Sequence, residues 1–302
     1  MRSFDEYKGI FPAFYACYED NGDVSPERAK ALALYLKKVG AKGLYVGGSS
    51  GECIYQSVEE RKQILEAVME AVGGDLTVIA HVACNNTKDS QELAAHAESL
   101  HVNAIASIPP IYFHLPNRAI AKYWNDISDA APNTDFIIYN IPQLAGTALS
   151  VPLLKEMLQN PRCIGVKNSS PATQDIQMWR DEGAIVFNGP DEQLVAGLAT
   201  GAIGGIGGTY GLMPELYIKI YNCVKNGEMD KARDINNDCC RIIYKACSGV
   251  GNMYAMIKEV MRINGAPDIG GVREPLYPLA ESDREICRDI ASMIQEAVNK
   301  YC

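Results

Sequence analysis

The sequence predicts an α/β protein, a (β/α)8 TIM barrel with a C-terminal helical extension. Short apolar runs alternate with longer helical patterns from residue 9 to residue 225, and only helical patterns follow. Eight strand–helix units in this length fit a barrel, which takes roughly 250 residues. The alternative is a doubly wound open sheet, which usually has fewer strands and a glycine-rich turn after the first strand.

Each expected strand is apolar almost without interruption, as is typical of strands that are covered on both faces. The expected strands span 9–17, 43–48, 76–82, 103–109, 135–140, 163–167, 184–189 and 202–207. We therefore expect a barrel over residues 1–225 and a helical extension of the same domain over 226–302.

Helix-start signals separate the strands. Ser25 precedes a first-turn proline, residues 57–60 form a capping box, and Ser150 and Ser170 each precede a proline at the start of a helical pattern. Helical spacing after the eighth strand predicts helices over 212–225, 228–247, 252–263 and 281–300.

Composition narrows the class of partner to a small molecule. The formal net charge is −9, which disfavours binding to nucleic acid or to an anionic membrane. No apolar window is long enough for a membrane span, and the N-terminal residues lack a signal-peptide pattern. The ten cysteines are scattered without a C-x-x-C, which favours reduced thiols in the cytoplasm, and the four histidines lack metal-site spacing, so we expect no metal site.

One strand runs directly into an ammonium group: the apolar stretch CIGVK ends at Lys167. In such barrels the chemistry lies where strands meet the following loops. A lysine amine kept away from water there is a nucleophile that can form a Schiff base with a carbonyl. The alternative is a lysine that reaches into solvent or pairs with a buried carboxylate.

Two further features end neighbouring strands. Tyr139 ends the strand before that of Lys167, where its phenol could relay protons; the alternative is a core aromatic residue with a satisfied hydroxyl. The stretch GGSSGE (47–52) has glycines and hydroxyls suited to an anion such as the carboxylate of a 2-oxo acid. The alternative here is a tight turn with capping serines.

Together these motifs resemble the class I aldolases of the N-acetylneuraminate lyase and dihydrodipicolinate synthase family over nearly the full chain. The matching stretches are GGSSGE (47–52), YNIP (139–142) with its following glycine, GVKN (165–168), GPDEQL (189–194) and GGIGGTYG (204–211). The resemblance implies a barrel, a homotetramer, and no metal or organic cofactor. It implies that Lys167 forms the Schiff base, that Tyr139 relays protons assisted by Ser49, and that Tyr112 is lent across a subunit interface.

The resemblance also implies which residues hold the substrate. Ser49 and Ser50 would bind the carboxylate, and the remaining expected contacts are Leu144, Ser169, Gly189, Asp191, Glu192 and Gly208. Synthases of the family have an arginine where this chain has Leu144, which cannot bind a second carboxylate. Asp191 and Glu192 resemble acceptors for a polyhydroxy tail, or alternatively complement a helix dipole. Gly208 departs from the serine that is usual in sialate lyases.

These features predict reversible aldol cleavage of N-acetylneuraminate to N-acetylmannosamine and pyruvate. Gly208 keeps open another pyruvate aldolase that acts on a different 2-keto-3-deoxy sugar acid or on an aromatic aldehyde. Dihydrodipicolinate synthesis is disfavoured by Leu144. A non-catalytic protein that binds a 2-oxo acid is a further alternative, although nothing beside the barrel resembles an output module.

Overall fold

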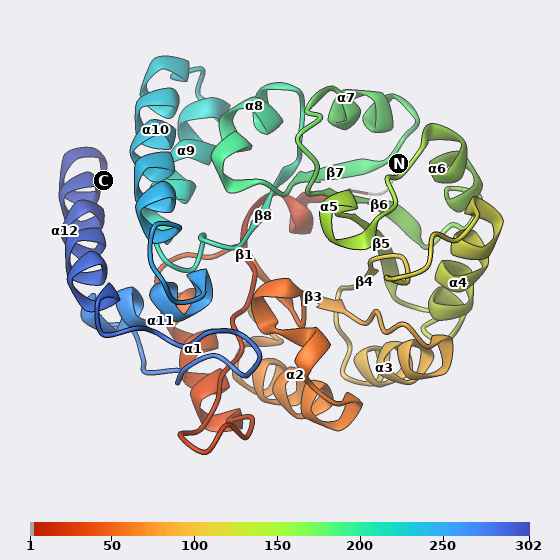
Figure 1. Ribbon diagram of the computed structural model, residues 1–302. Helices are drawn as coiled ribbons and strands as arrows, with labels where there is room; N and C mark the ends of the chain where they lie inside the picture. Colours follow the sequence, from red (N-terminus) through yellow and green to blue (C-terminus); the bar gives the residue numbers. More distant parts are fainter. Residues whose placement is uncertain (1–2) are drawn as a thin grey trace.

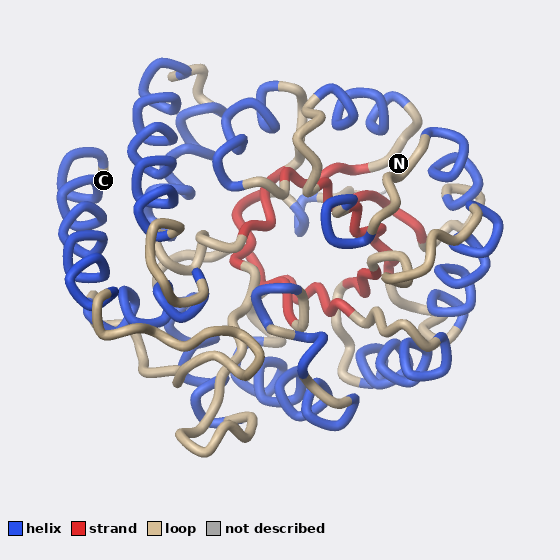
Figure 2. The backbone as a smooth tube through the Cα atoms, viewed as in Figure 1, coloured by secondary structure: helices blue, strands red, loops and turns tan. Residues whose placement is uncertain are grey.

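The computed structural model describes residues 3–302, whose eight strands form one parallel sheet in the order β1-β8-β7-β6-β5-β4-β3-β2. Figure 2 shows these strands as a ring inside a second ring of helices. The predicted TIM barrel is thus confirmed. The strands are β1 (Gly9–Pro12), β2 (Gly43–Val46), β3 (Thr77–His81), β4 (Ala104–Ser107), β5 (Asp135–Asn140), β6 (Cys163–Asn168), β7 (Ile185–Asn188) and β8 (Gly204–Gly207).

The first strand is shorter than predicted. It ends at Pro12, where the chain begins to turn toward the end of β2, although the Ala13 amide still donates to the Gly207 carbonyl of β8 at 2.9 Å. Ala13 forms a bridge with Tyr45, and the amide of Phe14 donates to the carbonyl of Tyr45 at 2.9 Å. Ala13 and Phe14 therefore close the ring between β1 and β2 instead of extending β1.

Helices cover the outside of the strand ring (Figure 1). Those that follow β1 to β8 are α1 (Pro26–Lys38), α2 (Val58–Val72), α3 (Thr87–Ser99), α4 (Asn117–Asp129), α5 (Pro142–Ala145), α6 (Val151–Met157), α7 (Gln174–Asp181), α8 (Leu194–Ala199) and α9 (Pro214–Lys225). Short 3₁₀ turns are η1 (Asp5–Tyr7), η2 (Ser49–Gly51), η3 (Cys53–Tyr55) and η4 (Asp191–Gln193).

Most predicted helix starts are confirmed by their caps. The hydroxyls of Ser25, Ser57 and Ser150 each accept a first-turn amide, and Ser57 completes a capping box with Glu60. The expected start at Ser170 was wrong, because the amide of Ser170 donates to the Asn168 side chain at 3.1 Å and the chain turns first. Helix α7 begins only at Gln174.

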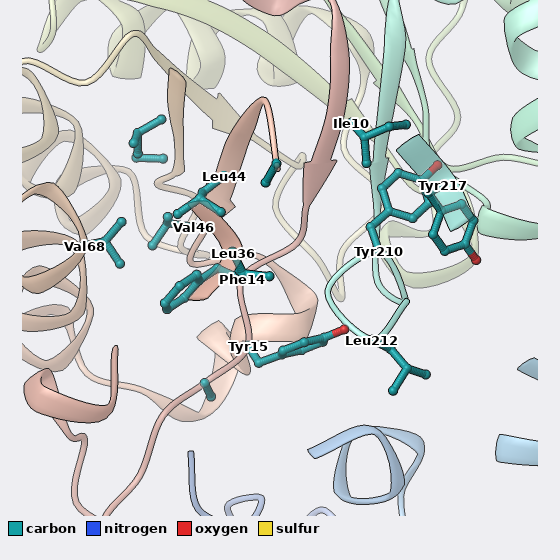
Figure 3. Packing of buried hydrophobic residues seen from close by; sticks show 14 of the residues in the cluster. Ile10, Phe14, Tyr15, Leu36, Leu44, Val46, Val68, Tyr210, Leu212 and Tyr217 are labelled. Atoms are coloured by element: carbon teal, nitrogen blue, oxygen red, sulfur yellow. The ribbon is translucent and has the colours of Figure 1, made fainter. Parts of the chain in front are cut away.

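Two apolar clusters stabilise the barrel. The inner cluster fills the strand ring and contains Phe11, Tyr45, Tyr139 and Phe187 among its buried members. The larger outer cluster lies between strands and helices, and Figure 3 shows part of it, with the rings of Tyr210 and Tyr217 side by side at 4.2 Å between centroids. Tyr45 and Tyr139 thus belong to the smaller, inner cluster.

The chain continues into α10 (Met229–Ala246), α11 (Met253–Ile263) and α12 (Asp283–Tyr301), close to the predicted limits. Figure 1 shows these helices gathered at one side of the barrel. Across residues 3–302, none of the helices combines the length and the apolar character needed to cross a membrane.

Candidate active site

Lys167 and Tyr139 lie opposite each other on the neighbouring strands β6 and β5. Both side chains are buried, and the Lys167 Nζ atom lies 3.7 Å from the centroid of the Tyr139 ring. Parallel pairing places them in one layer near the carboxyl ends of their strands. The two residues that the sequence singled out for chemistry are therefore brought together.

Tyr45, which the sequence analysis did not select, is the second aromatic neighbour of Lys167. Its ring centroid lies 4.4 Å from the Lys167 Nζ atom and 5.7 Å from the Tyr139 ring, which it meets edge-on. Its buried hydroxyl has no partner among the described residues, and burial holds its pKa well above the usual value. Tyr45 is therefore a neutral phenol beside the lysine.

His81, at the end of β3, was also missed. Together with Tyr45 and Tyr139 it forms what we call the aromatic wall. Its ring lies 5.9 Å from that of Tyr139, and its Nδ1 atom lies 2.9 Å from the carbonyl oxygen of Gly47. A carbonyl can only accept, so Nδ1 carries the proton. Burial, helped by the positive charge of Arg61, lowers the pKa of His81 to about 3. His81 is therefore neutral at physiological pH.

The serine turn, which we define as residues 47–52, adjoins this aromatic wall. Gly48 packs on the Tyr45 ring so closely that an added Cβ would lie 2.7 Å from a ring carbon. Ser49 and Ser50 follow in η2, and Ser50 is buried. The hydroxyl of Ser50 donates to the Tyr254 hydroxyl of α11 at 3.3 Å. Tyr45 thus connects the lysine to the turn that carries the two serines.

Glu52 ends the serine turn and makes a buried ion pair that the sequence analysis did not predict. Its carboxylate accepts from the Lys258 Nζ atom at 3.0 Å, and the exposed fractions of the two side chains are 0% and 2%. Lys258 lies four residues after Tyr254 on α11, so both face the barrel. A lysine within an otherwise apolar helix face was the sequence signal for this contact.

Asp191, which the sequence suggests as a contact of the polyhydroxy tail, is bound by the chain that follows β8. One of its oxygens accepts from the Thr209 amide at 2.6 Å and from the Thr209 hydroxyl, which also contacts the Tyr217 hydroxyl at 2.7 Å. Burial raises the pKa of Asp191 to about 6, opposed by the Thr209 hydrogen bonds. Asp191 therefore fixes the chain after β8, whereas its neighbour Glu192 is exposed.

Gly208 lies beside the serine turn, since a Cβ there would be 3.4 Å from the Ser50 hydroxyl oxygen. Its carbonyl accepts from the Tyr15 hydroxyl at 2.7 Å, and Figure 3 shows Tyr15 directed toward the chain that continues to Leu212. A serine in place of Gly208 would place its hydroxyl next to that of Ser50. This glycine thus leaves space between the two loops.

Ser169 and Gly189 lie against each other at the ends of β6 and β7. A Cβ on Gly189 would be 2.2 Å from the Ser169 hydroxyl oxygen, and the Gly189 amide donates to the Asn168 carbonyl at 2.7 Å. Leu144 lies on α5 and is 62% exposed. These loop residues surround the end of the barrel at which Lys167 and Tyr139 lie.

Tyr112 is not brought to Lys167 within this chain. It follows β4 with a left-handed backbone (φ 85°), is 88% exposed, and packs edge-on against Phe113 at 5.0 Å. Phe113 is also exposed, at 71%. The pair forms an aromatic surface outside the barrel.

No metal centre is built into the part of the chain that the structure describes: within residues 3–302, no group of three or more His, Cys, Asp or Glu side chains could hold an ion. The lysine, the phenols and the hydroxyls instead form a site suited to covalent chemistry on a carbonyl compound that bears an anionic group.

Known proteins of one family are similar to this chain over nearly its full length. The dihydrodipicolinate synthetase family matches residues 6–294. The N-acetylneuraminate lyase of Mediterraneibacter gnavus is 60% identical over 304 residues, which cover 100% of this chain and 96% of that protein. N-acetylneuraminate lyase 2 of Escherichia coli O6:H1 is 33% identical over 96% of this chain and 95% of its own length. A solved structure, the catalytic lysine mutant of Ruminococcus gnavus sialic acid aldolase, is 60% identical with a TM-score of 0.99 and full coverage of both chains.

Proposed function

The chain belongs to the dihydrodipicolinate synthetase family, and we propose that it is an aldolase that cleaves N-acetylneuraminate reversibly to N-acetylmannosamine and pyruvate. The observation that carries the mechanism is the position of the Lys167 amine. It is buried between the rings of Tyr139 and Tyr45, and no carboxylate of residues 3–302 forms an ion pair with it. Such an amine is available as a nucleophile.

The reaction follows from these groups. The Lys167 amine adds to the 2-oxo carbon of the open-chain sugar acid, and loss of water gives an iminium ion. Tyr139 takes the proton from the C4 hydroxyl and passes its own phenolic proton to the substrate carboxylate, while the C3–C4 bond breaks and the aldehyde leaves. The electron pair of that bond is held in an enamine, which is protonated at C3 and hydrolysed to pyruvate and the free lysine. The iminium accepts the electrons, so this route needs no metal or organic cofactor.

The serine turn supplies the anion site in this proposal. Ser49 and Ser50 would donate to the substrate carboxylate, while Ser169, Gly189, Glu192, Leu144 and Gly208 would line the path of the sugar tail. Asp191 would contact the sugar tail through the carboxylate oxygen that Thr209 does not engage. The exposed Leu144 offers no charge for a second carboxylate, which supports a sugar acid over aspartate semialdehyde.

We further propose a homotetramer in the cytoplasm. The exposed Tyr112 and Phe113 rings support an assembly in which Tyr112 reaches the site of a neighbouring subunit. All ten cysteines are free thiols, as is typical of a reducing compartment.

The test combines trapping with turnover. Borohydride reduction in the presence of pyruvate should add the mass of the reduced adduct at Lys167, and pyruvate should be released from N-acetylneuraminate faster than from a panel of 2-keto-3-deoxy sugar acids. Release from another sugar acid alone would favour the alternative aldolase. Absence of any adduct would contradict the Schiff-base mechanism and favour a non-catalytic binding protein.

A further inference from the structure

The serine turn ends at a residue with an unusual backbone. Glu52 has φ 53° and ψ 33°, the left-handed conformation, between η2 and η3. A side chain with a Cβ disfavours this conformation, which persists only where surrounding contacts hold it. The contacts of Glu52 therefore decide how the preceding two serines are oriented.

Both carboxylate oxygens of Glu52 are engaged by the C-terminal part of the chain. One accepts from the Lys258 Nζ atom at 3.0 Å, and the other accepts from the Arg273 amide at 2.9 Å. Lys258 also donates to the Gly271 carbonyl. Residues more than 200 positions away in the sequence thus hold this one turn residue.

A second contact from the same helix reaches the turn at Ser50. The hydroxyl of Ser50 is 3.3 Å from that of Tyr254, four residues before Lys258 on α11. The turn is also tied to the barrel, because the Ala16 amide donates to the Ser50 carbonyl at 3.2 Å. Helix α11 therefore contacts the turn at two residues that flank Gly51.

We propose that Glu52 and Lys258 are positioning residues, through which α11, together with Tyr254, sets the orientation of Ser49 and Ser50 and hence the affinity for the carboxylate of a 2-oxo acid. The proposal rests on the proposed function, in which these serines bind that carboxylate. An ion pair that only attached the extension to the barrel could lie anywhere on their shared face. This pair lies on the turn residue whose backbone is left-handed and whose carboxylate is fully buried.

The experiment removes the pair without leaving a buried charge. In the double variant Glu52→Gln, Lys258→Met, the pyruvate concentration that gives half-maximal borohydride trapping and the KM for N-acetylneuraminate should each rise about tenfold or more. The kcat should change less than about threefold, because Lys167 and Tyr139 are untouched and only binding common to ground state and transition state is lost.

The matched control is Lys245→Met, Asp289→Asn, which removes a partly exposed ion pair of the same extension, on α10 and α12. Its half-saturation and KM should stay within about twofold of the wild type. A folded Glu52→Gln, Lys258→Met variant with wild-type KM, or with a reduced kcat at wild-type KM, would overturn the proposal.

Tyr254→Phe gives a second route to the same answer if the double variant does not fold. It removes only the hydroxyl that Ser50 contacts, and it should raise the half-saturating pyruvate concentration severalfold; an unchanged value would overturn the proposal. Trapping with the wild type distinguishes a failure of the proposed function from a failure of the positioning role. If the wild type forms no adduct, the proposed function fails and the positioning role fails with it, whereas an adduct with unaltered affinity in the variants refutes the positioning role alone.

Discussion

Lys167 and Lys258 are equally buried, at 5% and 4% exposed, yet their nitrogens have opposite surroundings. Lys258 contacts the Glu52 carboxylate and a backbone carbonyl, which satisfy an ammonium ion. Lys167 faces two aromatic rings instead, and it has no ion pair with residues 3–302. Burial alone therefore does not distinguish a lysine proposed as a nucleophile from one that holds the fold together; the presence or absence of a carboxylate partner is what differs between the two here. The sequence leaves both environments open for a lysine at the end of a strand, and this chain contains one lysine in each.

Removal of the Lys167 amine should have the largest effect. Lys167→Met should lower the rate of pyruvate release by about 10⁴-fold or more, since the nucleophile is lost. It should leave the free energy of unfolding within about 1 kcal/mol of the wild type, because no buried partner is left without its charge. Coupled assays and urea denaturation measure the two quantities. A Lys167→Met protein that unfolds several kcal/mol more easily would show that Lys167 has a structural partner after all.

Tyr139→Phe separates the ring that Lys167 contacts from the hydroxyl that relays protons. Turnover should fall by about 10²–10⁴-fold, the usual contribution of a positioned general acid or base. The pyruvate adduct at Lys167 should still form, because the ring against the amine is retained. Single-turnover kinetics with mass analysis of the trapped adduct test both statements, and an unchanged rate would remove Tyr139 from the mechanism.

Lys258→Met should lower the free energy of unfolding, whereas Lys167→Met should not. The variant leaves the Glu52 carboxylate buried without its partner, which costs about 3–5 kcal/mol of unfolding free energy. Addition of Glu52→Gln should recover most of this loss, because the unpaired charge disappears. Equal stability of the single and double variants in urea would mean that the ion pair is not what α11 contributes to the fold.

Asp191 extends the comparison to a buried anion. Its pKa is raised from 3.8 to about 6, so between these values the folded state binds more protons than the unfolded state and its contribution to stability falls as the pH rises. The free energy of unfolding of Asp191→Asn should therefore be about 1–2 kcal/mol higher than that of the wild type at pH 7.5. The difference should vanish only below about pH 3, where the carboxyl is protonated in both the folded and the unfolded state. A difference that is independent of pH across this window would contradict the shift.

The fold and the proximity of Lys167 to Tyr139 could be predicted because each strand is a continuous apolar run and the two residues stand at the ends of neighbouring strands. Tyr45 was not predicted, because within GLYVGG nothing distinguishes an inward-facing tyrosine from one that faces the helices. Lys258 and Tyr254 were missed for another reason: their partners Glu52 and Ser50 lie more than 200 residues away. The Thr209 contact of Asp191 could not be predicted, because Thr209 lies 18 residues later and becomes a neighbour only when β7 and β8 pair.

Gly48 packs directly on the Tyr45 ring, whereas Leu144 and Glu192 project from short helical segments outside the ring of strands. Substitutions should therefore be tolerated more readily at Leu144 and Glu192 than at Gly48, in natural as in laboratory evolution. Random libraries at Leu144 and Glu192 can diversify which aldehyde is accepted while the carbon–carbon bond chemistry survives. Libraries at Gly48 should return almost only glycine, since any larger residue would displace the ring beside the reactive amine.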